Sequence, residues 1–401
     1  MEGMVNMKLS LAFAAAVASL CAAASPVNKA ASSAPIGVFD SGVGGLTVLE
    51  QLLSVDRVDN VSGKLGPDGI PDLQGESFVQ LADQANLHYG SYAASGDDGC
   101  AFLRELTIRD ALFLLSGGYY ASASEAIPSG RKTPAKIIVV ACNTASAYGL
   151  AGVETVLSAS ASPVKVVGVV NAGARSALDM CGGGAIGVLS TPGTDASRVY
   201  PKTIAREAER RGVPAPQVAT LGCPDLADAI QRGRADAPAV ARGFFRSLVG
   251  KFRASGAKKP MSVLVFGCTH YPLMRKAFEE ALAEMQADPS FAQLLSREFS
   301  FVDPAIETAV ECRAILAQEG LLANREGESK VDMFVSVPSS GLPAGFLDSS
   351  GGLADEYKYG RKAGRDFTDT KFVPLAAAPA ERAAVFGAAK SLPAVNRALS
   401  R

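Results

Sequence analysis

The chain has 401 residues, of which 48% are hydrophobic and 20% are charged, and its formal net charge is -1. This length exceeds one usual domain, and the hydrophobic content suffices for two packed cores. No excess of positive charge is available to neutralise a phosphate backbone, so we expect no nucleic-acid partner. The two histidines, His88 and His270, and seven scattered cysteines lack the spacing of a zinc site, so we expect no metal.

Residues 1–24 differ from the rest of the chain. Lys8 precedes an apolar, alanine-rich run that ends near Ala24, which is the layout of a secretory signal peptide. The run is too short to span a bilayer, so we expect no membrane span. The segment therefore predicts an exported, periplasmic protein, and the alternative is a disordered extension or an organelle transit segment. Cys21 would leave with the signal, and the pairing of the other six cysteines cannot be deduced from sequence.

From Pro35 onward, short β-branched runs alternate with longer stretches of helical periodicity. This alternation is typical of α/β proteins with parallel sheets. The expected strands are 36–39, 78–82, 136–141, 165–170, 186–189, 217–221, 262–266 and 301–302.

Two of these units look like copies of two others. The strand and turn at 36–42 are echoed at 186–193, and the strand that precedes Cys142 is echoed by the strand that precedes Cys268. We therefore predict two similar doubly wound parallel-sheet domains related by pseudo-two-fold symmetry, with the active site between them. Extra residues in the first half fall at 56–75 and 91–133. A later irregular stretch, 338–370, has the composition of a surface loop.

Polar motifs follow three of the expected strands. They are Asp40-Ser41-Gly42, Cys142-Asn143-Thr144 and Cys268-Thr269-His270. In an open parallel sheet the ligand lies beyond the carboxyl ends of the strands, where these motifs fall. Thr144 and Thr269 are expected to cap helix N-termini, whose free backbone N–H groups suit a small anion.

Cys142 and Cys268 stand apart from the other cysteines. A free cysteine is usually a small core hydrophobe, and burial is the interpretation favoured for the remaining ones. These are Cys100, Cys181, Cys312 and, less clearly, Cys223. Cys142 and Cys268 each lie between an apolar strand and an expected helix N-terminus, a position that lowers a thiol pKa from about 8.5 toward neutrality.

A pair of matched thiols suits the inversion of a stereocentre. One group removes a proton from one face of a carbon and a second group returns a proton on the other face. Asp40 and His270 are candidates to tune the two thiols or to hold an ammonium group of the substrate. An ordinary hydrogen-bonded histidine is the alternative for His270. The loop 40–45 lacks both the P-loop ending and the GxGxxG spacing, so nucleotide binding is not expected.

Several motifs closely resemble glutamate racemases, and the similarity runs from Ile36 to about Thr308. The long ones are 39–48 (FDSGVGGLTV), 141–145 (ACNTA), 186–188 (IGV) with 193–194 (GT), and 267–272 (GCTHYP). The resemblance implies interconversion of L-glutamate and D-glutamate without pyridoxal phosphate, metal or any other cofactor. Cys142 and Cys268 would be the paired proton donor and acceptor, assisted by Asp40 and His270.

The resemblance also assigns substrate binding and domain limits. The implied substrate-binding residues are Asp40, Ser41, Tyr89, Gly90, Asn143, Thr144, Thr269 and His270. The first domain would comprise 36–163 and, from the C-terminal part, about 305–385, and the second domain 164–304. Family members commonly form homodimers and supply D-glutamate for peptidoglycan, a role that needs a cytoplasmic enzyme.

Three features depart from the family pattern. His88 stands where the family usually has proline, and Gln231 where it usually has a glutamate. If that glutamate supports the histidine in the family, support for His270 is either weakened or comes from another residue, such as Asp228. The third departure is the signal-like N-terminus.

Three alternatives stay open beside glutamate racemisation. The chain acts on another amino acid, such as aspartate, or it is an exported amino-acid-binding homologue without turnover. A thiol hydrolase that uses Cys268 and His270 is the third, and it leaves Cys142 without a role.

Overall fold

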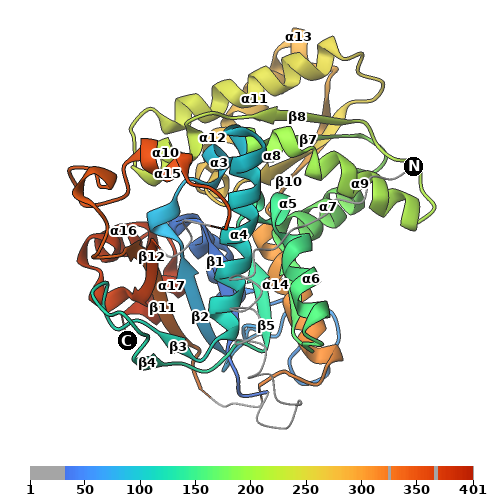
Figure 1. The fold of residues 1–401 in the computed structure, drawn as a ribbon. Coiled ribbons are helices and arrows are strands. Elements are labelled where there is room, and N and C mark those ends of the chain that lie inside the picture. The colour runs from blue at the N-terminus through green and yellow to red at the C-terminus, as the bar shows by residue number, and fades with distance from the viewer. Residues whose placement is uncertain (1–31, 324–326, 365–368, 401) are drawn as a thin grey trace.

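The computed structural model describes residues 32–323, 327–364 and 369–400. The predicted signal-like segment, 1–24, lies outside these residues. The described chain folds into two α/β halves, and the second half, green to yellow, occupies the upper part of Figure 1.

The first sheet has six strands in the order β12-β11-β2-β1-β5-β6. They are β1 (Ile36–Asp40), β2 (Ser77–Ala82), β5 (Ile137–Val140), β6 (Lys165–Gly168), β11 (Lys330–Pro338) and β12 (Thr370–Pro374). All neighbours are parallel except β11 and β12. The C-terminal strands, red in Figure 1, thus complete the sheet that the N-terminal strands, blue, begin.

The second sheet has four parallel strands in the order β10-β9-β7-β8. They are β7 (Ala185–Ser190), β8 (Val218–Gly222), β9 (Met261–Gly267) and β10 (Leu295–Val302). This order matches β6-β5-β1-β2 of the first sheet, with β7 in the place of β1 and β9 in the place of β5. The echoed sequence segments therefore occupy equivalent strands, and the prediction of two similar doubly wound parallel-sheet halves is confirmed.

Helices cover both faces of each sheet. One face of the first sheet packs against α2 (Leu46–Ser54), α14 (Pro304–Gln318), α16 (Pro379–Ala389) and α17 (Pro393–Leu399), and the other against α3 (Tyr89–Ala94), α4 (Gly96–Leu115), α5 (Asn143–Tyr148) and α6 (Leu150–Ala159). The second sheet lies between α7 (Val169–Met180) with α9 (Val199–Arg210) and the group α10 (Leu226–Gln231), α11 (Ala237–Ala254) and α12 (Arg275–Ala287).

The remaining elements are short. They are α8 (Pro192–Ser197), α13 (Pro289–Ala292), α15 (Asp355–Gly360), the hairpin β3 (Gly118–Tyr119) and β4 (Gly130–Arg131), and the 3-10 turns η2 (Val43–Gly45), η3 (Gln84–Asn86), η4 (Tyr271–Met274), η5 (Ala344–Phe346) and η6 (Leu375–Ala377).

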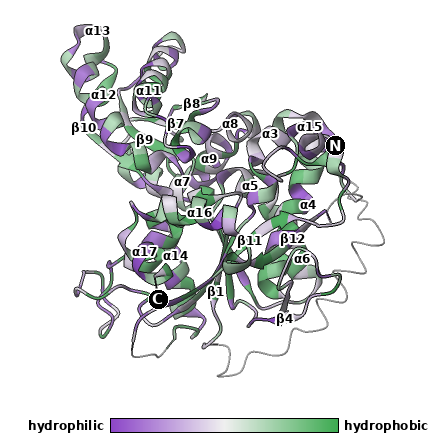
Figure 2. Cartoon of the chain, turned by 90° about the vertical axis from the view of Figure 1, so that its left-hand side faces the viewer, coloured by the Kyte–Doolittle hydropathy of each residue, from purple (hydrophilic) through white to green (hydrophobic). Residues whose placement is uncertain are grey.

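The strands are apolar because helices exclude water from both of their sides. All four residues of β5 are buried, and the strand reads Ile-Ile-Val-Val. Parallel strands covered on both faces characteristically have such continuous apolar runs. Burying each of these side chains contributes about 1.5–3 kcal/mol to folding. Figure 2 shows strands of the first sheet mainly in green, with purple on the outward sides of the helices.

Several predicted boundaries are wrong. Strand β6 pairs with β5, so Lys165–Gly168 belongs to the first sheet and not to a second domain that begins at 164. This strand also ends before 170, because Val169 already begins α7. The strand expected at 301–302 begins at Leu295. Strands β11 and β12 were not among the expected strands, although they supply the C-terminal part of the first half.

The three predicted insertions differ in character. The segment 91–133 contains the end of α3, the long helix α4 and the β3–β4 hairpin. The segment 56–75 contains a single isolated bridge, between Val58 and Leu65. The segment 338–370 contains η5 and α15.

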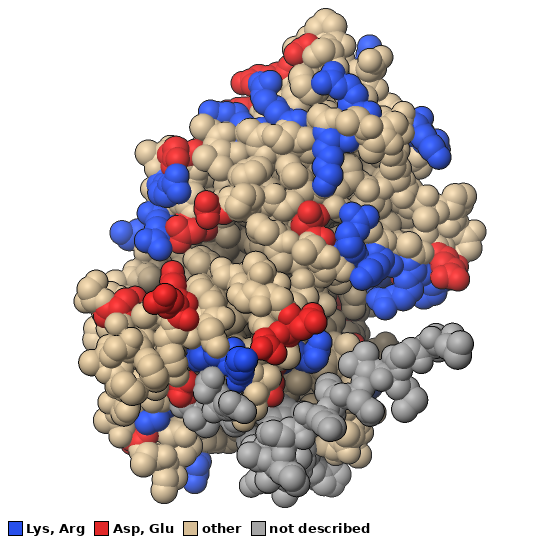
Figure 3. All heavy atoms as spheres, turned by 45° about the horizontal axis from the view of Figure 1, so that its top comes forward, with Lys and Arg blue, Asp and Glu red and all other residues tan. Residues whose placement is uncertain are grey.

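Charges of both signs are interspersed on the face shown in Figure 3, as the net charge of -1 leads one to expect. None of the helices in the described part of the chain combines the length and the apolar character that crossing a membrane requires.

Candidate active site

Three loops from the two halves meet at the carboxyl ends of β1, β5 and β9. Asp40, the last residue of β1, is buried, and its Oδ2 accepts hydrogen bonds from the backbone N–H of Gly45 at 2.8 Å and of Gly42 at 3.2 Å. Thr269 and His270 of the second half pack closely against this loop. A Cβ atom at Gly44 would lie 2.3 Å from Oγ1 of Thr269, so only glycine fits there.

Cys142 lies at the start of α5 and is itself the N-cap. The backbone N–H of Ala145 donates to its Sγ at 3.4 Å, and its thiol lies 3.7 Å from Oγ of Ser41. The predicted N-cap at Thr144 is therefore wrong, because the helix begins at Asn143 and Thr144 already lies within it. Burial raises the pKa of the Cys142 thiol, and the neighbouring Asp40 charge raises it further.

Cys268 follows β9 at the equivalent position in the second half. Its Sγ lies 3.7 Å from Nδ1 of His270. The next element is the 3-10 turn η4, whose N-cap is His270 without a side-chain cap bond, so the predicted N-cap at Thr269 is also wrong. Burial raises the pKa of the Cys268 thiol to about 12.

The expectation that helix termini bring both thiol pKa values toward neutrality is therefore wrong in sign. The desolvation of the thiolates at these buried positions outweighs the backbone N–H groups near them. A thiolate at either position requires a neighbouring base.

Asp40 lies within electrostatic reach of both thiols. Burial raises its pKa to about 6, although backbone N–H groups and the Cys142 thiol partly offset this effect by hydrogen bonding. The Asp40 charge also raises the pKa of Cys268. Asp40 is thus mostly ionised near neutral pH, and it can accept a proton from Cys142.

His270 is positioned by Gln231 on α10. Its Nε2 lies 2.9 Å from Oε1 of Gln231. Because Oε1 can only accept, the ring carries its hydrogen on Nε2 and turns the lone pair of Nδ1 toward Cys268. Burial lowers the pKa of His270 to about 4, so the ring is neutral at pH 7.

The expected support of His270 by Asp228 is not found. The Asp228 carboxylate contacts Nε2 of His88 instead, at 3.3 Å. This contact joins the loop before α3 in the first half to α10 in the second half. Both positions that depart from the family pattern, His88 and Gln231, therefore make contacts with polar side chains of the second half.

The other predicted substrate-binding residues divide into two groups. Ser41, Asn143 and Thr144 lie beside Asp40 or Cys142 at the strand ends, and Thr269 lies between Cys268 and His270. Gly90 faces Thr191 of the second half. The Tyr89 phenol, in contrast, hydrogen-bonds to two buried carboxyl groups of the first half.

Three second-half side chains that contact this site were not among the predicted site residues. The Tyr200 hydroxyl donates to Oδ1 of Asn143 at 2.6 Å, and the Thr144 hydroxyl lies 3.1 Å from those of both Thr191 and Thr194. Thr194 belongs to a motif that the sequence had singled out, whereas nothing local marks Tyr200.

The other described cysteines are not part of the site. All six cysteines in the described ranges are free, and Cys181, Cys223 and Cys312 are buried while Cys100 is partly exposed. The favoured interpretation of burial therefore holds for three of the four. No group of three or more His, Cys, Asp or Glu side chains in the described part of the chain is arranged to hold a metal ion.

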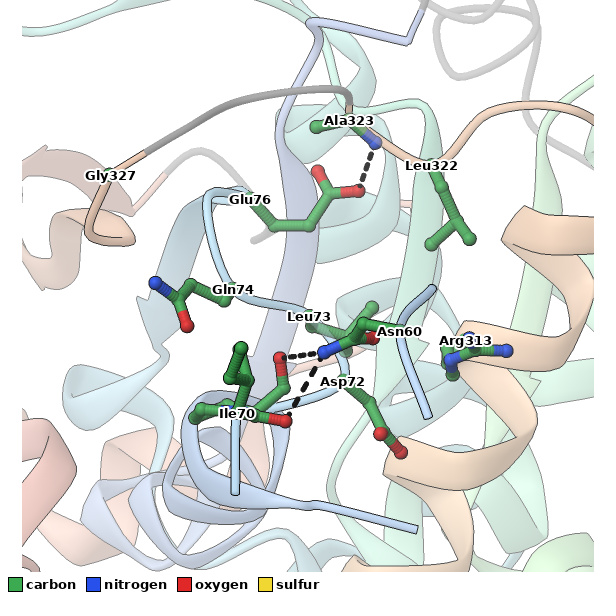
Figure 4. Close-up of a pocket in the computed structure, with 11 residues that line it drawn as sticks. Asn60, Ile70, Asp72, Leu73, Gln74, Glu76, Arg313, Leu322, Ala323 and Gly327 are labelled. Carbon is green, nitrogen blue, oxygen red and sulfur yellow. Dashed lines mark hydrogen bonds between the residues drawn. The ribbon is translucent and has the colours of Figure 1, made fainter. Parts of the chain in front are cut away.

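A cavity of about 510 Å³ lies elsewhere, between the insertion 56–75 and the chain at and after α14 (Figure 4). Its acidic side chains already have partners. The Asp72 carboxylate accepts backbone N–H groups, and Glu76 pairs with Lys136 at 2.7 Å. Glu76 precedes β2, at the opposite end of the sheet from the cysteines, so this cavity is separate from the cysteine site.

Comparisons with known proteins agree with this geometry. A family model described as Asp/Glu/Hydantoin racemase matches residues 118–294. The glutamate racemase of Geobacter metallireducens is 30% identical over 332 residues, which cover 82% of this chain and 98% of that protein. The glutamate racemase of Levilactobacillus brevis is 31% identical over 288 residues, which cover 72% of this chain and 80% of that protein.

Solved structures show the same fold. A glutamate racemase isoform from Bacillus anthracis superimposes with a TM-score of 0.54 at 26% identity, covering 75% of this chain and 88% of that one. The glutamate racemase from Francisella tularensis, in complex with D-glutamate, gives 0.52 at 22% identity, covering 82% and 95%. With matched cysteines at equivalent strand ends and relatives of this similarity over nearly their whole length, the chain belongs to the glutamate racemase family.

Proposed function

We propose that the chain interconverts L-glutamate and D-glutamate with Cys142 and Cys268 as the two acid/base groups. The observation that carries this proposal is that both thiols follow equivalent strands of the two sheets and that the charge of one carboxylate, Asp40, acts on both of them. Racemisation requires one group on each face of the α-carbon, and two facing half-domains supply such a pair.

The proton transfers follow from the neighbours of each thiol. In one direction His270 accepts the Cys268 proton through Nδ1, and the thiolate then removes the α-proton from one face of the substrate. The Cys142 thiol donates its proton to the other face, and protonated Asp40 or solvent restores it. In the reverse direction Asp40 accepts the Cys142 proton first, and Cys268 is the donor.

Glutamate is the proposed substrate because relatives that are 30% and 31% identical to this chain are glutamate racemases. The hydroxyl and amide groups of Ser41, Asn143, Thr144 and Thr269 supply hydrogen bonds for the carboxylate groups of such a substrate. The resulting D-glutamate would serve peptidoglycan synthesis. Export, which the segment 1–24 predicts, and a homodimer both remain predictions, and N-terminal sequencing of the mature protein and sedimentation analysis test them.

A chiral assay tests the proposed function. Purified full-length chain is incubated with L-glutamate under reducing conditions, and the two enantiomers are separated and measured over time. We expect conversion to approach an equal mixture, and a parallel panel with aspartate and other L-amino acids should react far more slowly. Absence of D-glutamate would contradict the proposal, and binding without exchange of the α-proton would indicate a non-catalytic binding protein.

A further inference from the structure

A buried acidic pair lies behind the active site, around the phenol of Tyr89. The Tyr89 hydroxyl oxygen lies 2.5 Å from Oδ2 of Asp83 and 2.6 Å from Oδ2 of Asp110. All three side chains are almost fully buried, with relative exposures of 1%, 0% and 0%. The proposed proton transfers use none of these groups.

The short distances between these oxygen atoms limit the number of protons in the cluster. A phenol has one hydrogen and donates it to one acceptor, so two ionised carboxylates cannot both be satisfied at these distances. Asp83 has other donors, because its Oδ1 accepts Nδ2 of Asn86 at 2.7 Å and a guanidinium nitrogen of Arg109 at 3.2 Å. Within the described ranges, by contrast, no group hydrogen-bonds to Oδ1 of Asp110, and Arg109 lies 3.8 Å away.

We infer that Asp110 is a neutral carboxylic acid that donates its proton to Tyr89, and that Tyr89 donates its own hydrogen to ionised Asp83. The charged groups that face Asp110 are Asp83, Asp40 and Arg109, so two negative charges oppose one positive charge. Burial raises the pKa of Asp110 well above its usual range, and the Asp83 charge raises it further. Both effects keep the proton on Asp110 at neutral pH.

This arrangement makes Asp110 a positioning residue for the proposed racemisation, on which this functional part of the inference rests. Tyr89 is the first residue of α3, and Gly90 next to it faces Thr191 of the second half. A Cβ atom at Gly193 would lie 2.9 Å from that of Ala93, so α3 and α8 touch closely across the two halves. The fixed phenol therefore holds the turn that meets Thr191, which in turn contacts Thr144.

The pH dependence of thermal unfolding tests the protonation state without any activity. In the folded protein the proton stays on Asp110, whereas in the unfolded chain it dissociates above a pH of about 4, so wild-type stability falls as pH rises. Asp110→Asn keeps a donor to Tyr89 and removes this titration. We expect the difference between the two unfolding midpoints, variant minus wild type, to increase by roughly 1–3 °C for each pH unit between 5 and 8.

The opposite result has a distinct signature. If Asp110 is ionised and paired with Arg109, the variant loses that charge and its midpoint lies below that of wild type across this pH range. A difference that does not change with pH would also overturn the inference. Asp83→Asn is the matched variant, and we expect it to lower the midpoint throughout, because it removes the ionised acceptor beside Arg109.

Racemase kinetics then test the positioning role. With glutamate as the probe, we expect Asp110→Asn to stay within about threefold of wild type in kcat/KM, whereas Asp110→Ala should raise KM at least tenfold and change kcat much less. Equal losses in both variants, or none in either, would overturn the role. A chain without racemase activity would refute the proposed function while the unfolding data still decide the protonation of Asp110.

Discussion

The loops that carry Cys142 and Cys268 occupy equivalent strand ends, but they differ in their chemistry. Cys142 caps a regular helix and lies beside a carboxylate, Asp40, whose pKa is about 6. Cys268 precedes a 3-10 turn and lies beside an imidazole, His270, whose pKa is about 4. One base is therefore anionic before it accepts a proton, and the other is neutral.

This difference shows that a repeated fold fixes where the two thiols lie but not how each is activated. In the proposed mechanism, residues that differ between the two halves decide the activation. The Asp40 carboxylate belongs to the first half, and its charge raises the pKa of both thiols. Gln231 belongs to the second half, and its side chain hydrogen-bonds to His270. The following changes separate the two halves of the mechanism.

The largest effect is expected from removing either thiol. Cys142→Ser and Cys268→Ser should each lower kcat for racemisation by about a thousandfold or more, because a serine hydroxyl is a far weaker acid/base group at these positions. Steady-state kinetics in both directions measure the loss. Cys181→Ser, a buried thiol in the core of the second half, is the control and should stay within a few fold of wild type. Full activity in either active-site variant would contradict the pairing.

Replacing the anionic base comes next. Asp40→Asn should lower kcat/KM by about a hundredfold, and equally in both directions, because the equilibrium constant between two enantiomers is one. In wild type this base works only when ionised, so kcat/KM is high above a pH of about 6 and falls as the pH drops through that value. The pH profile of kcat/KM shows this limb, and we expect it to disappear in the variant. A wild-type profile without an acidic limb between pH 5 and 7 would argue against Asp40 as the base.

A smaller effect is expected at the neutral base. Gln231→Glu places a negatively charged carboxylate next to Nε2 of His270 and should raise the pKa of the ring from about 4. Because the base must be neutral, racemase activity is lost at a higher pH than in wild type as the pH falls, with a severalfold decrease at pH 6. Gln231→Leu, which removes the acceptor, is the contrasting variant and should lower activity at every pH. Profiles that coincide for wild type and Gln231→Glu would refute the positioning of His270.

The smallest effect is expected at the contact between His88 and Asp228, which joins the two halves away from the thiols. Asp228→Asn removes the partner of His88, whose pKa burial lowers and Asp228 partly restores. Since both side chains are about one-third exposed, the pair contributes at most about 1 kcal/mol to stability. We expect less than a threefold change in kcat/KM and an unfolding midpoint that shifts by a few degrees at most. A larger loss of activity would mean that this contact governs closure of the two halves.

The sequence predicted the apolar strands that lead to Asp40, Cys142 and Cys268 because such strands are a local pattern. An apolar strand followed by Cys142 or Cys268 shows where a loop begins, and the echo between halves shows which strands correspond. The membership of β6 was missed because an apolar run looks the same in either sheet. The predicted direction of the thiol pKa shifts was wrong, because these shifts depend on desolvation by loops from both halves.

Contacts between residues that are far apart in the sequence could not be predicted for a related reason. Tyr200 on α9 reaches Asn143 across the two halves, and Asp110 on α4 reaches Tyr89 on α3. Neither pairing has a local pattern, because the two partners are brought together only by the packing of separate elements. Gln231 was noticed only as a departure, and its bond to His270 became evident from the structure.

The most direct test of the central claim measures exchange at the α-carbon in the single cysteine variants. Cys142→Ala and Cys268→Ala are incubated in D2O with L-glutamate and, separately, with D-glutamate, and deuterium incorporation is followed by mass spectrometry. We predict that each variant exchanges one enantiomer without inverting it, and that the two variants prefer opposite enantiomers, because each retains a base on one face only. The same enantiomer preference in both variants, or exchange of both enantiomers by either one, would contradict a mechanism with two thiols on opposite faces.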